Sequence, residues 1–215
     1  MPDISLEAFR ERIRPFDFPY IYEQFKPIKG KIKCRSDDFV VDEVLAYEPS
    51  GEGEHLFVRM EKHDIAMEDF FKLLRTVLDV PQTEVGYAGL KDKVAVTRQT
   101  FSLPASCEAR LPLLEEHDVK ILDVSRHTNR LKVGHLRGNR FDILLKGVPE
   151  ELRELAVTVG QHVANKGMVN IYGNQRFGRG FESVRVGWDV MAGNMRIQAM
   201  SRMKRRFIVS ALQSF

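Results

Sequence analysis

The sequence is poor in cysteine. Its 215 residues include two cysteines, Cys34 and Cys107, which lie far apart and show no paired spacing. Because disulfide frameworks and cysteine-based zinc sites need several thiols at characteristic spacings, we expect neither, and two isolated thiols fit a reducing compartment. The six histidines show no metal-ligand spacing either. We therefore predict no metal and no cofactor.

Long apolar runs are also missing. No stretch approaches the ~20 apolar residues that cross a bilayer, and the N-terminus, with Asp3, Glu7 and Arg10, lacks the apolar core of a signal peptide. We expect a cytoplasmic protein without membrane contact. The content of 43% hydrophobic and 29% charged residues is that of an ordinary globular protein, long enough to bury a core as one domain or two.

The sequence has no large excess of one charge, since the formal net charge is +3, but its basic residues are unevenly distributed. Two segments contain no acid, 124–141 and the chain after Asp189, and both are rich in arginine. Such segments predict a positive surface for a polyanion, and a solvated basic face without a ligand is the alternative.

The residue pattern predicts strands in groups, with helices between the groups rather than in strict alternation. We expect strands over 31–34, 39–46, 55–62, 85–88, 95–103, 119–125, 130–136 and 141–145, the first three together forming an antiparallel pair or meander. Helices are expected from Asp64 or Ala66 to Asp79, briefly over 104–117, and from Pro149 to about Asn165. This grouping predicts the α+β class, with a mixed, largely antiparallel sheet and helices packed on one face.

The stretch GYAGLKDKVAVTRQTFSL, from Gly86 to Leu103, reads as two strands joined by a tight turn that carries Lys91, Asp92 and Lys93. Glycines allow the backbone to approach closely here, and an acid held between two lysines on a turn is a candidate functional carboxylate. A solvated charged turn is the alternative.

Two further stretches carry polar groups on glycine-rich loops. HLRGNRF, from His135 to Phe141, could be a turn leading into a strand. VNIYGNQRFGRG, from Val169 to Gly180, offers backbone donors and a planar guanidinium to a phosphate or an RNA edge, or is a structural loop.

These stretches, in this order, resemble the TruD family of tRNA pseudouridine synthases, which has a Gly-(Leu or Gln)-Lys-Asp-Lys turn, a Gly-Asn-x-Phe element and a Gln-Arg-Phe-Gly loop. The segment Asp38–Lys62 also resembles the opening of that family's catalytic domain. The resemblance implies a pseudouridine-synthase-like catalytic domain that isomerises uridine 13 of tRNA without a cofactor. It assigns Asp92 as the catalytic residue and implies substrate contacts from Lys33, Asn139, Phe141, Gln175, Arg176 and Phe177.

Within that resemblance, Lys33 lies near the catalytic acid, where an opposite charge favours the carboxylate form, and Phe141 stacks on the target base. The basic residues expected to contact the RNA backbone are Lys91, Lys93, Arg98, Arg126, Arg130, Arg137, Arg140, Arg202, Lys204 and Arg205. The expected domains are an N-terminal arm over 1–29, an incomplete catalytic domain over 30–205, and over 206–215 the start of a helix leading to an inserted domain.

Two other classes of function stay open. A truncated or degenerate relative would bind RNA without catalysis, because the family's C-terminal return of the sheet is missing. A small-molecule hydrolase using Asp92 has the lone acid in its favour, but no His or second carboxylate stands near it in the sequence. The sequence predicts no oligomeric state.

Overall fold

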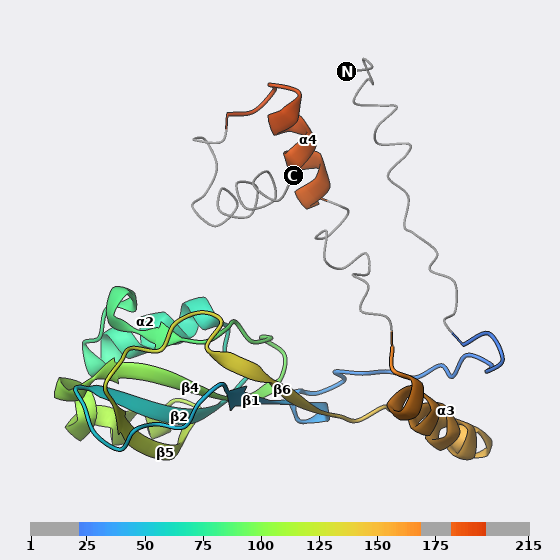
Figure 1. Ribbon diagram of the computed structural model, residues 1–215, viewed down its shortest axis with the longest axis horizontal. Helices are drawn as coiled ribbons and strands as arrows, with labels where there is room; N and C mark the ends of the chain where they lie inside the picture. The colour runs from blue at the N-terminus through green and yellow to red at the C-terminus, as the bar shows by residue number, and fades with distance from the viewer. Residues whose placement is uncertain (1–21, 169–181, 197–215) are drawn as a thin grey trace. The chain divides into compact units, whose positions relative to one another are not determined.

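The computed structural model describes residues 22–168 and 182–196 (Figure 1). The chain divides into two compact units, one of them Pro27–Ala156; the second contains the other described residues. The predicted arm over 1–29, catalytic domain over 30–205 and helix start over 206–215 stay predictions. Within the described segments, no helix has the length and apolar character needed to span a bilayer.

The first unit is built on one six-stranded sheet. Its strands are β1 (Phe39–Leu45), β2 (His55–His63), β3 (Gly86–Tyr87), β4 (Val96–Pro104), β5 (Val119–His127) and β6 (Leu136–Ile143). The strand order is β5-β2-β4-β1-β6, with β3 also paired to β4. The β1–β4 pair is parallel and the other pairs are antiparallel. The predicted α+β class with a mixed, largely antiparallel sheet is confirmed.

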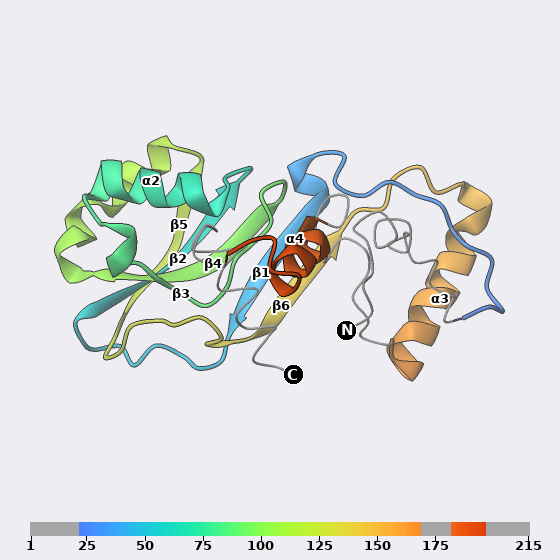
Figure 2. The ribbon, with the colours of Figure 1, turned by 90° about the horizontal axis from the view of Figure 1, so that it is seen from above.

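Helices cover one face of this sheet (Figure 2). The elements of the unit are η1 (Ser36–Asp38), α2 (Met67–Leu78), η2 (Gln82–Glu84), the 3-10 segment η3 (Ala105–Glu116) and η4 (Glu150–Leu152). Helix α2 forms because its apolar residues recur on one stripe, and Phe70, Leu74 and Leu78 of that stripe are fully buried. Each such side chain contributes roughly 1.5–3 kcal/mol to folding. Together with residues of β2, β4 and η3 they form the main core.

Four local predictions are wrong. In place of the strand expected over 31–34 there is a single isolated bridge, between Lys31 and Lys146. Strands β1 and β2 are not a hairpin, because β4 lies between them and pairs with both. The expected strand over 130–136 is absent among the described elements, and β6 begins at Leu136 and runs through Gly138 and Asn139 without a turn. Tyr87 of β3 pairs with Phe101, which lies in the second half of β4 and not at its start. Residues 88–95 therefore form a loop, not a tight turn; we call this segment the Asp92 loop.

The second unit contains most of α3 (Arg153–Lys166), and α4 (Glu182–Met191). Gly167, with a φ of +81°, follows the last residue of α3 and allows the left-handed turn that ends the helix. The rings of Tyr22 and Phe25 pack edge-on against His162 of α3, with ring centres 4.6 and 5.3 Å apart. The residue pattern over 181–206 favours an irregular or weakly helical segment, whereas α4 within it is a regular helix.

Candidate active site

The face of the sheet that α2 covers continues across β1 and β6. Register pairs Lys62 of β2 with Thr97 of β4 and Thr97 with Val41 of β1, so these three side chains share a face. Lys62 Nζ lies 3.5 Å from Sδ of Met67, the first residue of α2, which identifies that face as the helix-bearing one. Val41 in turn pairs with Phe141 of β6. The candidate site lies on this continuation of the face.

A cleft of about 260 Å³ opens there, and we call it the Asp92 cleft. Its lining comes from three elements: Val41 of β1; Leu90, Lys91 and Asp92 of the Asp92 loop; and Asn139 and Phe141 of β6. Because Asn139 and Phe141 are two residues apart on a strand, both point to this side. The fold thus brings Asp92 together with Asn139 and Phe141, which lie almost 50 positions further along the chain. The sequence predicts that these three residues act together.

Lys33 completes the cluster beside Asp92. Its Nζ lies 3.3 Å from Asp92 Oδ2, with the two side chains 28% and 48% exposed, so the acid is within reach of a ligand. The same Nζ lies 3.9 Å from the centre of the Phe39 ring, a cation–π distance. Lys33 also has a φ of 55°, a left-handed conformation that costs a non-glycine residue roughly 1–2 kcal/mol. Such strain is concentrated at functional sites in proteins.

Phe141 offers an aromatic surface in the cleft. Half of the residue is exposed, which is unusual for a large apolar side chain at the centre of a site. Its ring packs edge-on against Phe39, with centres 5.9 Å apart, and Phe39 itself is buried. Phe39 therefore contacts both Lys33 and Phe141, and it fixes the spacing between the cation and the exposed ring.

Beneath the Asp92 loop lies a buried ion pair. Lys91 Nζ is 2.5 Å from Glu43 Oε2, and the two side chains are 3% and 0% exposed. Glu43 Oε1 accepts the backbone N–H of Thr100 at 3.1 Å. Lys62, also buried, has its pKa lowered from 10.5 to about 8, first by burial and then by the positive charge of Lys91, with the Glu43 carboxylate acting in the opposite direction. We assign Lys91 to this interior pair rather than to an RNA phosphate.

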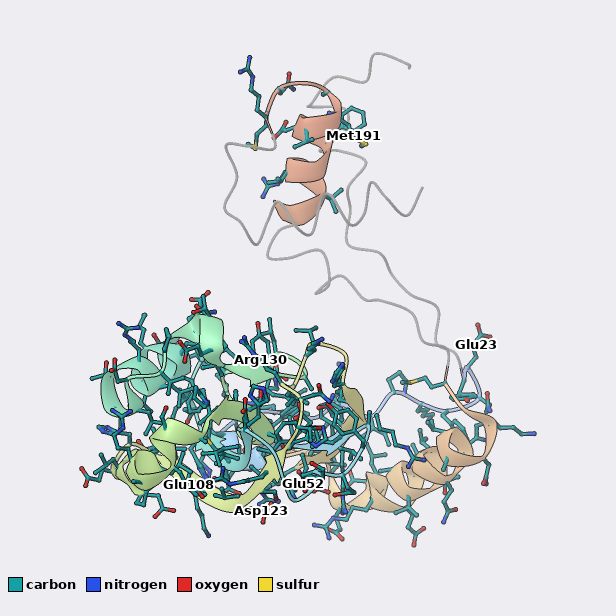
Figure 3. The ribbon with its side chains drawn as sticks, turned by 60° about the vertical axis from the view of Figure 1, so that its left-hand side comes forward. Glu23, Glu52, Glu108, Asp123, Arg130 and Met191 are labelled. Carbon is teal, nitrogen blue, oxygen red and sulfur yellow. The ribbon has the colours of Figure 1, made fainter. Side chains whose placement is uncertain are left out.

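Several predicted phosphate contacts lie away from the cleft. Arg98 follows Thr97 on β4, so it points to the opposite face, where its Nε lies 2.6 Å from Glu61 Oε2. Arg126 is on β5, the far edge strand, and pairs with Glu108 of η3; Figure 3 labels Glu108. Arg130 donates to the Val85 carbonyl at 2.6 Å.

The basic segment 124–141 therefore splits between the two edges of the sheet. Arg137 and Arg140 are exposed on β6, and Arg140 Nη2 lies 3.8 Å from Asp142. Lys93, next to Asp92, is exposed. Gln175, Arg176, Phe177, Arg202, Lys204 and Arg205 lie outside the described residues, and their roles stay predictions.

A larger hollow, of about 430 Å³, is lined by Cys34, Arg35, Ser36, Asp37, His63, Asp64 and Val94. It contains no Phe, Tyr or Trp ring, and its mixed charges fit neither a stacked base nor a phosphate as well as the Asp92 cleft does. Across the described residues, no three His, Cys, Asp or Glu side chains gather so as to hold a metal ion.

Sequence reasoning missed Glu43 and Phe39. Both alternate with Val41 on β1, so the pattern Phe39, Val41, Glu43 places an acid on the inward face of a strand. A carboxylate at such a position needs a buried partner, and this was the signal that could have identified Glu43. The contact of Phe39 with Lys33 has no such signal, because it depends on the backbone turn at Lys33.

Comparison with known proteins gives consistent matches. The family model described as tRNA pseudouridine synthase D (TruD) matches residues 16–208. The tRNA pseudouridine synthase D of a Thermus thermophilus strain is 42% identical over 203 residues, which are 94% of this chain and 56% of that protein. That of an Anaeromyxobacter species is 37% identical over 202 residues, 92% of this chain and 57% of that protein.

A solved structure agrees with these matches. The crystal structure of a putative tRNA pseudouridine synthase D from Methanosarcina mazei aligns with a TM-score of 0.66 and 29% identity, covering 79% of this chain and 40% of that one. The chain spans about half the length of the curated relatives it matches.

Proposed function

This chain belongs to the TruD family of tRNA pseudouridine synthases, and on that premise we propose that it isomerises a uridine of tRNA to pseudouridine. The observation that supports the proposal most is the Asp92 carboxylate, which lies 3.3 Å from Lys33 and lines one cleft together with Asn139 and Phe141. By family resemblance the target is uridine 13. No described residue identifies that position.

The reaction needs one well-placed carboxylate and no oxidant or reductant. The bond between N1 and C1′ of the uridine breaks, the base turns, and C5 joins C1′; C5 then loses its proton and N1 ends with one. Asp92 can attack C1′ or stabilise the positive charge that develops there, and it can then help to move the C5 proton. Lys33 holds the Asp92 carboxylate in place through their ion pair.

The target base has to leave its stack to reach Asp92. This extrusion costs a few kcal/mol, and stacking on the exposed ring of Phe141 returns roughly 1–3 kcal/mol of it. A phenyl ring has no ionisable proton, so Phe141 holds the base but takes no part in acid–base chemistry. The amide of Asn139 can donate to and accept from the polar edge of the uracil.

The RNA backbone would be held by basic residues near the cleft. Lys93 and Arg137 are exposed and adjoin its lining, one residue from Asp92 and two from Asn139. For each phosphate contact of this kind, the logarithm of the RNA-binding constant falls against the logarithm of the salt concentration with a slope of roughly 0.7–0.9. Such contacts position the RNA and read no sequence.

A second candidate is an RNA-binding relative without catalysis. It is favoured by the surface along β6, the last strand in the sheet order, where Phe141, Ile143, Leu144 and Leu145 are 43–53% exposed. Exposed apolar residues on an edge strand are uncommon in proteins, and among the described residues no strand pairs with the outer edge of β6.

One experiment separates the two candidates. The chain is incubated with a tRNA transcript, the RNA is digested, and pseudouridine is quantified by chromatography, while carbodiimide marking and sequencing locate the modified position. The control transcript carries cytidine at position 13. Conversion of the first transcript and not of the second supports the proposed isomerase with its target. Binding of tRNA without any pseudouridine contradicts it and favours the second candidate.

A further inference from the structure

Glu43 is two residues from Val41 on β1, and it points to the same side as the lining of the Asp92 cleft. Its neighbour across the β1–β6 pair is Asn139, which also lines the cleft. The Glu43 carboxylate has no exposed surface. It therefore lies directly below the site and cannot contact a substrate.

Both oxygens of this carboxylate are used, and they reach two different elements. One accepts the backbone N–H of Thr100 on β4, and the other is paired with Lys91 on the Asp92 loop. Glu43 thus joins the rigid sheet to the segment that carries the proposed catalytic acid. Gln99, the neighbour of Thr100, adds a second tie, because its Nε2 donates to the Gly89 carbonyl at 3.3 Å.

The charges buried around Glu43 explain why its ion pair with Lys91 determines the position of the Asp92 loop. The buried ammonium groups of Lys62 and Lys91 repel each other, and the Glu43 carboxylate, which is ion-paired with Lys91, counters the positive charge of both. If the carboxylate were neutral, Lys91 would be a buried cation beside another cation, and it would leave the interior to be solvated. Asp92 is the next residue in the chain, within ~3.8 Å measured between Cα atoms, and it would move with Lys91.

We propose that Glu43 is a positioning residue, whose buried ion pair with Lys91 holds the Asp92 loop against the sheet and so places the Asp92 carboxylate in the cleft. The pair acts on the reaction through Lys91 and the loop, not by contact with the RNA. This inference rests on the proposed function for its effect on catalysis. The placement of the loop can be measured without any reaction.

The test variant is Glu43→Gln, because the new amide oxygen can still accept from the Thr100 N–H while the negative charge is lost. The matched control is Asp42→Asn. Asp42 is the neighbouring residue on the same strand and is also ion-paired, with Oδ1 2.7 Å from Arg59 Nη2, but it lies on the opposite face. The double variant Glu43→Gln/Lys91→Met removes both charges.

Loop placement is read from the reaction of lysines with an amine-specific acylating reagent, followed by peptide mass analysis. The exposed Lys93 is the internal reference for the buried Lys91. In the wild type and in Asp42→Asn, Lys91 should stay protected. In Glu43→Gln its labelling should rise at least ~10-fold toward that of Lys93, as local opening exposes it. Unchanged protection of Lys91 would overturn the proposal.

The core thiol of Cys107, which is fully buried, reports whether the sheet itself has opened. If Cys107 becomes reactive in Glu43→Gln along with Lys91, the pair is a general stability element and the positioning role is wrong. In that case the double variant, which lacks the buried Lys91 ammonium, should also regain a protected Cys107.

Catalysis is read with the same tRNA transcript. We expect Glu43→Gln to lower kcat at least ~10-fold with KM changed much less, since the RNA-contacting surface is untouched, and the double variant to recover part of the loss. A double variant with protected Cys107 and kcat as low as that of Glu43→Gln would show that Glu43 does not act through Lys91. If the wild type forms no pseudouridine, the proposed function fails, and Lys91 labelling still decides this inference.

Discussion

Lys62 is a buried cation whose removal should stabilise the protein in a pH-dependent way. Its side chain is 1% exposed, and its pKa falls from 10.5 to about 8, by burial first and then by Lys91. Substitution by Met keeps the length of the side chain, removes the charge and suits the surrounding rings of Phe70 and Phe101.

The expected magnitude follows from linkage. Below pH 8 the folded and unfolded chains both bind the Lys62 proton, and the folded state carries the full cost of the buried charge. Between pH 8 and 10.5 the unfolded chain binds the proton and the folded chain does not, so stability rises with pH. At about 1.36 kcal/mol per unit, the shift corresponds to about 3 kcal/mol. Lys62→Met should be more stable than the wild type by up to this amount at neutral pH, and the difference should shrink above pH 8.

Urea unfolding, followed by the far-ultraviolet circular dichroism signal of the β-sheet, measures the difference in unfolding free energy between the two proteins at about pH 7 and about pH 9.5. The single tryptophan, Trp188, lies in α4 of the second unit, so circular dichroism rather than tryptophan fluorescence is the probe for the sheet of the first unit. The reasoning is refuted if Lys62→Met is less stable at neutral pH, or if the difference between the two proteins is the same at both pH values.

Two further predictions concern the first unit. In Gly86→Ala the new Cβ would collide with the Ser102 hydroxyl and with a backbone carbonyl, so we expect a loss of roughly 1–3 kcal/mol in unfolding free energy. Gly138→Ala, with no atom within 4 Å of its Cβ, should unfold at the same urea concentration as the wild type or above, and equal stability of the two variants would contradict the packing at Gly86. A thiol reagent should modify the exposed Cys34 of the native protein and spare Cys107, whose pKa is raised by burial; mass analysis showing two rapid additions would contradict the buried position of Cys107.

The fold class could be predicted because it depends on local pattern. The apolar stripe of α2 and the β-branched runs of β1, β2 and β4 identify their elements without neighbours. Strand order could not be predicted in this way. The insertion of β4 between β1 and β2 results from long-range pairing. The ordinary expectation, that strands adjacent in the sequence also pair in the sheet, fails here.

The candidate site was predicted in part for a similar reason. Asp92, Asn139 and Phe141 are recognisable as motifs, and the structure brings them together with Lys33. The basic residues were predicted from their density along the chain. Density says nothing about which edge or face of a sheet receives each arginine, so Arg98 and Arg126, although close to the motifs in sequence, pair with acids away from the cleft.

The central claim is that the Asp92 carboxylate carries the chemistry, and the most direct measurement is the single-turnover rate of pseudouridine formation by Asp92→Asn, beside Asp37→Asn as an exposed carboxylate outside the cleft. We predict that Asp92→Asn lowers the rate at least ~100-fold while the affinity for tRNA stays close to that of the wild type, and that Asp37→Asn reacts normally. A rate for Asp92→Asn equal to that of Asp37→Asn would contradict the account.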